Sequence, residues 1–281
     1  MFGVKEIICE MFGDMFFRKK RNRNCLEYLE IHLTDHCNLN CACCCHFAPI
    51  ARQYYMTLEV FKRDIERLAF LSGGNIKRIR LMGGEPLLHP QIKEFMKIAR
   101  LYFPKYEIAI HSNGILLDNM DDEFWKVCSA NRIDIVLSYY PISIDYTLIS
   151  RLSLKNNVVL KIEIDTSKKM FRNFKMDLRG SQNYRKSWHY CTHANASVNL
   201  YEGKLYSCDI TAHSKHLSDY FNIPLEYTNK DYVDIYKETS MRDVLRKLNL
   251  PHPFCKYCCP NDSEIIEWCV SKNELSEWAK V

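Results

Sequence analysis

Several features that define large classes of protein are missing from this sequence. No stretch approaches the roughly 18 consecutive apolar residues of a membrane-spanning helix. The net charge is only +5 on 281 residues, and no basic stripe interleaved with aromatic residues stands out, so nucleic acid is not an expected partner. Internal repeats and low-complexity tracts are missing too. With 47% hydrophobic residues, the chain is typical of a globular protein with one large domain, or one domain with a smaller appendage.

The N-terminus lacks the uninterrupted apolar core of a secretory signal peptide, because Lys5, Glu6, Glu10 and Asp14 interrupt it. We therefore expect a cytoplasmic protein. In that compartment, the 14 cysteines indicate metal binding rather than disulfides.

Residues 1–24 form a separate amphipathic and basic extension. Apolar residues recur there at helical spacing, and a basic run from Arg18 to Arg23 follows. We favour a helix packed on the domain and followed by a solvated linker. The alternative is an interfacial helix that makes peripheral contact with anionic lipid.

From residue 26 onward, strands and helices alternate. The expected strands are 26–33, 76–82, 106–112, 132–140 and 157–165, and the expected helices are 57–73, 89–103, 121–131 and 144–154. Thr57 is the predicted N-cap of the first helix, and Gly73 lies past its end. Such alternation predicts an α/β fold with parallel strands and outer helices. Polar motifs stand where the strands end, which is where active sites lie in such folds.

The alternation stops near residue 168. The following segment has short strand-like pieces at 196–208 and one clear helix around 240–249. We therefore predict three parts: the extension 1–24, a main domain 25–179, and a small C-terminal domain 180–281.

Five cysteines lie within nine residues directly after the first strand. Cys37, Cys41 and Cys44 have the spacing C-x3-C-x2-C, and Cys45 also permits C-x3-C-x3-C. Three thiolates can bind three irons of a 4Fe–4S cluster and leave the fourth iron open, whereas electron-transfer clusters use four cysteines. Zinc is the alternative, with His32, His36 and His46 as further ligands, but the loop lacks the usual paired spacing.

This loop, together with "MGGEP" at 82–86, resembles the radical S-adenosylmethionine (SAM) superfamily. The resemblance implies a partial (β/α)6 barrel in which Cys37, Cys41 and Cys44 hold a 4Fe–4S cluster whose open iron binds SAM. It also implies that the SAM ammonium meets Gly83, Gly84 and Glu85, the last through its carboxylate. Ser112, Asn113 and Ser138, at the ends of later strands, are candidates for contacts to the ribose or carboxylate of SAM.

The sequence departs from the family pattern at one position. The family usually has an aromatic residue before the third cysteine, at the side of the adenine. Cys43 stands there, so the adenine must pack differently on that side. Cys43 and Cys45 are then spare thiols, while Cys25 and Cys128 (with Cys9) are interpreted as inert buried thiols.

A second cysteine set resembles the twitch domain, the short form of the SPASM extension in many radical SAM enzymes. The segment ending "GKLYSC" separates Cys191 from Cys208, and Cys255 and Cys258 form a C-x2-C pair. The resemblance implies a small α+β domain with one auxiliary 4Fe–4S cluster. A four-thiolate zinc site is the alternative that the spacing allows. Cys259 is a possible substitute for Cys258.

A closed auxiliary cluster favours net oxidation of a substrate radical. The layout most resembles the butirosin-type aminocyclitol (deoxy-scyllo-inosamine) dehydrogenases, which favours a small carbohydrate-like substrate: a sugar, an aminocyclitol or a nucleotide-linked sugar. A flavodoxin or ferredoxin would supply electrons. A peptide maturase, a carbohydrate epimerase and a non-catalytic metal-binding module are the alternatives. The catalytic base is unknown, and the search covers Glu163, Asp165, His111, Tyr139 and Cys269.

Overall fold

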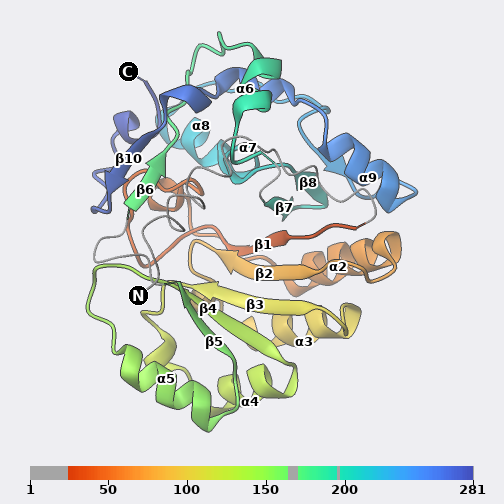
Figure 1. The fold of residues 1–281 in the computed structure, drawn as a ribbon, viewed down its shortest axis with the longest axis vertical. Coiled ribbons are helices and arrows are strands. Elements are labelled where there is room, and N and C mark those ends of the chain that lie inside the picture. The colour runs from red at the N-terminus through yellow and green to blue at the C-terminus, as the bar shows by residue number, and fades with distance from the viewer. Residues whose placement is uncertain (1–24, 164–169, 195–196, 281) are drawn as a thin grey trace, which may run out of the picture.

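The computed structural model describes residues 25–163, 170–194 and 197–280 (Figure 1). The centre of the molecule is an eight-stranded sheet with the order β5-β4-β3-β2-β1-β7-β8-β9. The predicted extension 1–24 lies outside the described residues. Within the described ranges, no helix is both long and apolar enough to cross a membrane.

The predicted strand–helix alternation forms one half of this sheet, where neighbouring strands pair in parallel. Its strands are β1 (Leu29–Thr34), β2 (Arg78–Gly83), β3 (Glu107–Ser112), β4 (Ile133–Ser138) and β5 (Leu160–Glu163). Its helices are α2 (Leu58–Ser72), α3 (Ile92–Tyr102), α4 (Asp122–Ala130) and α5 (Tyr146–Lys155). Short 3-10 turns are η1 (Ala48–Ile50), η2 (Pro86–Leu88) and η3 (Leu117–Asn119). The predicted α/β class with a parallel central sheet is confirmed, and it is consistent with a partial barrel.

The C-terminal segment extends the same sheet on the other side of β1. Strand β7 (Val198–Tyr201) pairs with β1 in parallel, and β8 (Lys204–Tyr206) and β9 (Val233–Asp234) follow as antiparallel strands. The sixth parallel strand therefore comes from beyond residue 179, where the sequence placed the end of the main domain. The division at 179/180 stays a prediction, but the sheet runs through it.

The remaining elements lie above the sheet in Figure 1. They are helices α6 (Tyr184–Tyr190), α7 (Asp209–His213), α8 (Lys215–Phe221) and α9 (Met241–Leu248), and the turns η4 (Pro253–Tyr257), η5 (Pro260–Asp262) and η6 (Leu275–Glu277). A second, two-stranded sheet pairs β6 (Met170–Asn173) with β10 (Glu264–Glu267) in antiparallel fashion. This pairing brings the last 20 residues back toward the end of β1.

Helix α2 shows why the local predictions succeeded. The Thr57 side chain accepts a hydrogen bond from Val60 N, and Gly73 ends the helix in the left-handed conformation at φ 59°. Phe61, Ile65 and Leu68 recur on one face and are buried in the main core. Capping residues and apolar spacing therefore agree at both ends of this helix.

Strand β1 is buried on both faces. Leu29, Ile31 and Leu33 join the main core, in which α2 and α3 also pack. Successive side chains of a strand point to opposite faces, so Glu30 and His32 point away from that core, and both are buried as well. The face of β1 opposite the main core is therefore polar.

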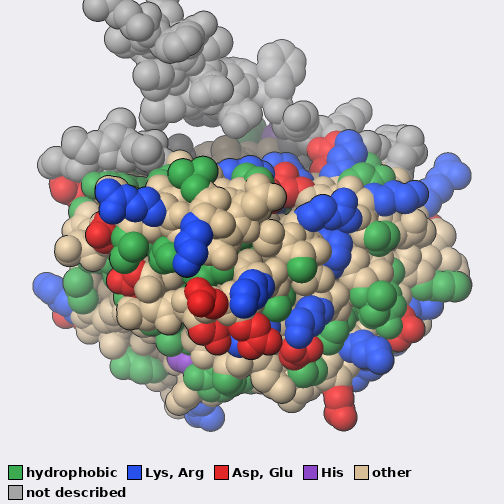
Figure 2. Space-filling model, turned by 90° about the horizontal axis from the view of Figure 1, so that it is seen from below, with side chains coloured by type: hydrophobic (Ala, Val, Ile, Leu, Met, Phe, Trp, Pro, Cys, Tyr) green, Lys and Arg blue, Asp and Glu red, His purple; other side chains and the backbone are tan. Residues whose placement is uncertain are grey.

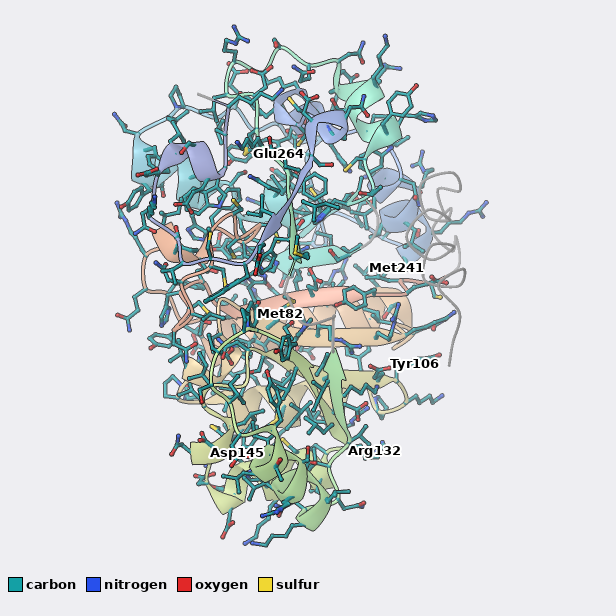
Figure 3. The ribbon with its side chains drawn as sticks, turned by 60° about the vertical axis from the view of Figure 1, so that its left-hand side comes forward. Met82, Tyr106, Arg132, Asp145, Met241 and Glu264 are labelled. Carbon is teal, nitrogen blue, oxygen red and sulfur yellow. The ribbon has the colours of Figure 1, made fainter. Side chains whose placement is uncertain are left out.

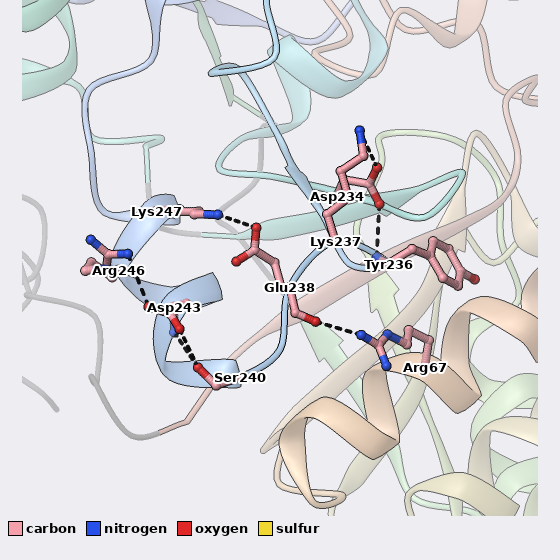
Figure 4. Close-up of polar contacts among 9 residues, drawn as sticks. All are labelled: Arg67, Asp234, Tyr236, Lys237, Glu238, Ser240, Asp243, Arg246 and Lys247. Carbon is pink, nitrogen blue, oxygen red and sulfur yellow. Dashed lines mark hydrogen bonds and ion pairs between the residues drawn. The ribbon is translucent and has the colours of Figure 1, made fainter.

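The C-terminal segment is attached to α2 by polar contacts (Figure 4). Arg67 of α2 donates to the carbonyls of Ile235 and Glu238. Lys247 of α9 forms an ion pair with the Glu238 side chain, which is buried.

On the surface seen from below, basic and acidic side chains are intermixed, so the charges on this face are not all of one sign (Figure 2).

Candidate active site

The predicted site residues gather at the carboxyl ends of the parallel strands. In Figure 3, Met82 lies near the carboxyl end of β2. Tyr106 and Arg132, which precede β3 and β4, lie at the opposite end of the parallel strands. The cysteine loop follows β1, the glycine pair ends β2, and Ser112 and Ser138 end β3 and β4. This is the edge at which ligands bind in open α/β sheets.

The three predicted cluster ligands lie close together. Burial raises the pKa of the Cys37 thiol to about 12, with smaller contributions from Cys44 and Cys41. The Tyr140 phenol lies beside the same thiols: burial first, then Cys41, Cys44 and Cys37, raise its pKa well above the ordinary value. The thiolate is the form that binds iron, and the positive charge of an iron centre would favour that form of these buried thiols.

Protein N–H groups donate hydrogen bonds to two of these sulfurs. Leu39 N lies 3.3 Å from Cys37 Sγ, and Asn113 Nδ2 lies 3.6 Å from the same sulfur. Trp268 Nε1 lies 3.1 Å from Cys41 Sγ. Hydrogen bonds to cluster sulfurs are among the factors that set the reduction potential of an iron–sulfur cluster. No local pattern indicated Trp268, because it is 227 residues from Cys41 in the sequence.

The two thiols not assigned to a cluster, Cys43 and Cys45, have different neighbours. Burial, followed by Glu277, raises the pKa of the Cys43 thiol to about 11, and the backbone of Cys43 is left-handed at φ 58°. Cys45 instead makes a side-chain hydrogen bond to Asp209. The prediction that Cys43 borders the adenine of SAM stays a prediction, and in the structure its neighbours belong to the C-terminal segment.

Residues 269–278 hold the cysteine loop in place by hydrogen bonds to its backbone. Ala42 N donates to the Cys269 carbonyl at 2.9 Å, and Ser271 N donates to the Asn40 carbonyl at 2.9 Å. The Trp278 indole donates to the Cys44 carbonyl at 2.9 Å. The loop geometry therefore depends on residues 269–278 as well as on β1.

The two glycines of "GGEP" allow backbone to pack against backbone. A Cβ on Gly83 would lie 2.1 Å from the Thr34 oxygen, and one on Gly84 would lie 2.1 Å from the His36 oxygen. Gly84 N donates to the Thr34 carbonyl at 2.9 Å. Only glycine allows this approach. The pair thus positions the start of the cysteine loop, in addition to its predicted role toward SAM.

The Glu85 carboxylate is fully buried and joins the ends of β2 and β3. It accepts hydrogen bonds from Leu87 N at 3.1 Å, Ser112 Oγ at 2.8 Å and Asn113 N at 2.9 Å. Burial raises its pKa to about 7 despite these bonds. The expected contact between this carboxylate and the SAM ammonium stays a prediction. In the structure its partners are protein groups, so its visible role is to position Ser112 and Asn113.

The candidates for the catalytic base do not lie together in one place. His111 Nε2 lies 2.9 Å from Ser138 Oγ, so this candidate base and this candidate SAM contact are neighbours. Tyr139 stacks on Tyr146, with ring centroids 5.9 Å apart. Cys269 is exposed. The Glu163 side chain and all of Asp165 lie outside what the structure describes.

The second cysteine set also converges. Cys191, Cys208, Cys255 and Cys258 line one cavity, with Phe174, Trp188 and Ala194 among its other walls. Burial raises the pKa of Cys208 to about 12. Burial, followed by four neighbouring cysteines, raises the pKa of Cys258 well above the ordinary value. Four thiols in an enclosed site fit either a 4Fe–4S cluster or tetrahedral zinc. Cys259 lines the same cavity, so it remains a possible substitute ligand.

A buried carboxylate connects the surroundings of the two sets. Asp209 follows Cys208 directly, and its Oδ1 lies 3.1 Å from His193 Nδ1. Its Oδ2 lies 3.9 Å from Nε2 of His46, in the first cysteine loop. Burial opposes ionisation of Asp209, but His193 and His46 together hold its pKa below the usual range. The sequence analysis considered His46 only as a possible zinc ligand, and Asp209 not at all.

Comparison with known proteins agrees with this geometry. Residues 31–147 match the family profile of the Radical SAM superfamily. The GTP 3',8-cyclase of Chlorobaculum tepidum is 38% identical over 98 residues, which are 34% of this chain and 28% of that protein. The GTP 3',8-cyclase of Microcystis aeruginosa is 31% identical over 118 residues, 41% of this chain and 35% of that protein. The matches therefore span about a third of the length of these relatives.

A structural match covers more of the chain. The crystal structure titled BtrN in complex with AdoMet and 2-DOIA matches with a TM-score of 0.52 and 17% identity, over 83% of this chain and 92% of that one. At this identity, the likeness establishes the fold alone. Radical SAM proteins use a 4Fe–4S cluster and SAM, and the C-terminal cysteines are consistent with an additional cluster. With the profile match and the cysteine loop at the end of β1, residues 31–147 of the chain are similar to the radical SAM superfamily.

Proposed function

We propose that the protein is a radical SAM dehydrogenase of a small carbohydrate-like substrate: a sugar, an aminocyclitol or a nucleotide-linked sugar. Bound at Cys37, Cys41 and Cys44, a reduced cluster would supply an electron that cleaves SAM and generates the radical that takes a hydrogen atom from the substrate. The electron source would be a flavodoxin or ferredoxin.

The observation that carries this proposal is the pair of cysteine sets, three thiols in one and four in the other. A set of three leaves a coordination position for SAM, whereas a set of four closes the cluster, which can then only exchange electrons. A closed second cluster suits a reaction that removes an electron as well as a hydrogen atom. The contacts of Asp209 to His46 and His193 connect the surroundings of the two sets.

The chain's own residues have distinct parts in this reaction. Gly83 and Gly84 hold β2 against the loop after β1. Glu85 orients Ser112 and Asn113 toward the SAM side of the site. Of the described residues on the search list, His111 is the one we favour for accepting the substrate proton, because it is hydrogen-bonded to Ser138 at the end of the neighbouring strand and a neutral imidazole nitrogen can act as a general base.

Epimerisation is the second candidate, supported by the position of Cys269. This thiol is exposed, and its backbone pairs with the cysteine loop. An epimerase must return a hydrogen atom to the substrate, and a thiol can supply it. The relatives named GTP 3',8-cyclase match part of the chain only, so GTP belongs among the substrates to be tested.

The test is SAM cleavage and product analysis under anaerobic conditions. Reconstituted protein, dithionite and SAM should yield 5′-deoxyadenosine, and a substrate screen should yield a product two hydrogens lighter. Cys208→Ser should retain deoxyadenosine formation but lose the oxidised product, and Cys269→Ala should retain both. A product of unchanged mass that requires Cys269 would establish epimerisation instead, and no deoxyadenosine in any mixture would refute the proposal.

A further inference from the structure

A group of buried polar side chains between β1 and α7 has no part in the proposed reaction. His32 comes from β1, Asp35 follows that strand, and His213 ends α7. One ligand-type atom from each lies within 4.8 Å of those of the other two. The three residues are 1%, 2% and 1% exposed.

Each of these side chains has a polar atom without a hydrogen-bond partner among the described residues. The atoms are His32 Nε2, Asp35 Oδ1 and His213 Nδ1. Buried polar groups are almost always hydrogen-bonded, so three orphaned atoms in one cluster require an explanation. A shared bound ion would satisfy all three.

In Asp35 and His213, the other polar atom of the side chain is held by a neighbour. Asp35 Oδ2 accepts a hydrogen bond from the Tyr201 hydroxyl at 3.2 Å and lies 3.5 Å from His216 Nε2. His213 Nε2 lies 3.4 Å from Asn199 Oδ1. Metal ligands are characteristically oriented in this way by hydrogen bonds to the atom that does not bind the metal.

We propose that His32, Asp35 and His213 bind one divalent transition-metal ion of the Zn²⁺ class, separate from both cysteine sets. Two imidazoles and one carboxylate are a ligand set that zinc and ferrous iron accept, and imidazole disfavours Mg²⁺ and Ca²⁺. Burial lowers the pKa of both histidines well below the ordinary value, so both rings are neutral and can donate a lone pair. The fourth coordination position remains for water or a substrate oxygen.

The ion would join the two halves of the molecule. His32 lies on the strand that leads into the first cysteine loop, and His213 ends the helix that begins directly after Cys208. The two rings stack with centroids 3.8 Å apart and planes at 18°. Because a metal lies in the plane of the imidazole that binds it, and Asn199 holds the His213 ring, the His32 ring must rotate on binding.

The neighbouring group of Cys45, His46 and Asp209 also has metal-binding chemistry. It differs in one ligand type, because it would place sulfur on the ion. Sulfur ligands lie about 2.3 Å from zinc, whereas nitrogen and oxygen ligands lie about 2.0–2.2 Å from it. X-ray absorption can therefore distinguish these sites, and can distinguish the proposed site from zinc in either cysteine set.

The experiment uses the cluster-loaded protein with Zn²⁺ as the probe. Competition with a fluorescent zinc chelator measures the affinity, and zinc K-edge absorption measures the ligands. We expect one zinc per chain with only nitrogen and oxygen ligands. His32→Gln and His213→Gln should each weaken binding by about 100-fold or more, since loss of even a supporting contact costs about 10–100-fold. His89→Gln is the matched control: His89 is 2% exposed and bonds the Met56 carbonyl instead, so its zinc affinity should equal that of the wild type.

Three results would overturn the proposal. They are a sulfur shell near 2.3 Å in the wild type, unchanged zinc affinity in both ligand variants, and no zinc retained by the wild type at micromolar free Zn²⁺. Should the glutamine variants unfold, Asp35→Asn removes the carboxylate while retaining the side-chain shape. The absorption measurement on the wild type decides the ligand type without any variant.

Discussion

Replacing Gly84 with alanine tests the close approach of two backbone segments at the proposed SAM site. The added Cβ would lie 2.1 Å from the His36 oxygen, whereas real Cβ contacts are at least 3.0 Å, so the two backbones must separate by about 0.9 Å (3.0 − 2.1). That movement strains the bonds from Gly84 N to Thr34 O and from Glu85 N to His36 O. Overpacking costs about 1–3 kcal/mol and each of the two weakened hydrogen bonds about 1 kcal/mol, so we expect a loss of about 3–5 kcal/mol.

This loss should appear in function as well as stability, because the displaced segment carries the cysteine loop. We expect the SAM dissociation constant of Gly84→Ala to rise at least about tenfold, which requires only about 1.4 kcal/mol of the strain to act on the site. Anaerobic equilibrium dialysis with labelled SAM measures the affinity, and thermal unfolding measures the stability.

Gly73→Ala is the matched control. Gly73 has a left-handed φ of 59°, and no atom lies within 4 Å of its added Cβ. Left-handed alanine costs about 1–2 kcal/mol, so this variant should lose stability while binding SAM as the wild type does. Wild-type stability and SAM affinity in Gly84→Ala would refute the reasoning, as would equal losses of SAM affinity in both variants.

Three further predictions concern charge, potential and ligand choice. Hydrogen bonds led by that from Ser181 lower the pKa of Asp177 to about 2. Asp177→Asn should therefore reduce the free energy of unfolding by about 2 kcal/mol at pH 7, and the difference should vanish as pH falls from about 4 to 2, measured by urea unfolding. Trp268→Phe removes the N–H donor to Cys41 Sγ; redox titration should show a first-cluster potential lower by tens of millivolts, since about 40 mV corresponds to 1 kcal/mol for one electron. Cys43→Ala should leave the iron content unchanged, whereas Cys37→Ala should remove about four irons per chain; equal iron in both variants would contradict the ligand assignment.

Local chemistry explains which parts of the fold the sequence predicted. Helix α2 was predicted to within one residue, because Thr57 and Gly73 mark its ends and its apolar spacing is regular. The parallel order of β1 to β5 follows from the strand–helix alternation. The buried states of Cys25 and Cys128 were also predicted correctly.

Long-range pairing explains what the sequence did not predict. Strand β7 joins β1 across more than 160 residues, and no local pattern specifies that partner. The indole of Trp268 reaches Cys41 only because β10 returns to pair with β6. His213 lay outside every recognised motif, and its neighbour His32 was considered only as a ligand for zinc in the cysteine loop. Proximity of such residues is a property of the assembled sheet.

The central claim is that the chain holds two iron–sulfur clusters with different ligand sets. Iron and zinc per chain, measured after anaerobic reconstitution of the wild type and Cys208→Ser, test it most directly. The account predicts about eight irons in the wild type and about four in the variant, with SAM cleavage retained. Four irons in both proteins, with zinc in the second cysteine set of the wild type, would contradict it and remove the electron acceptor on which net oxidation depends.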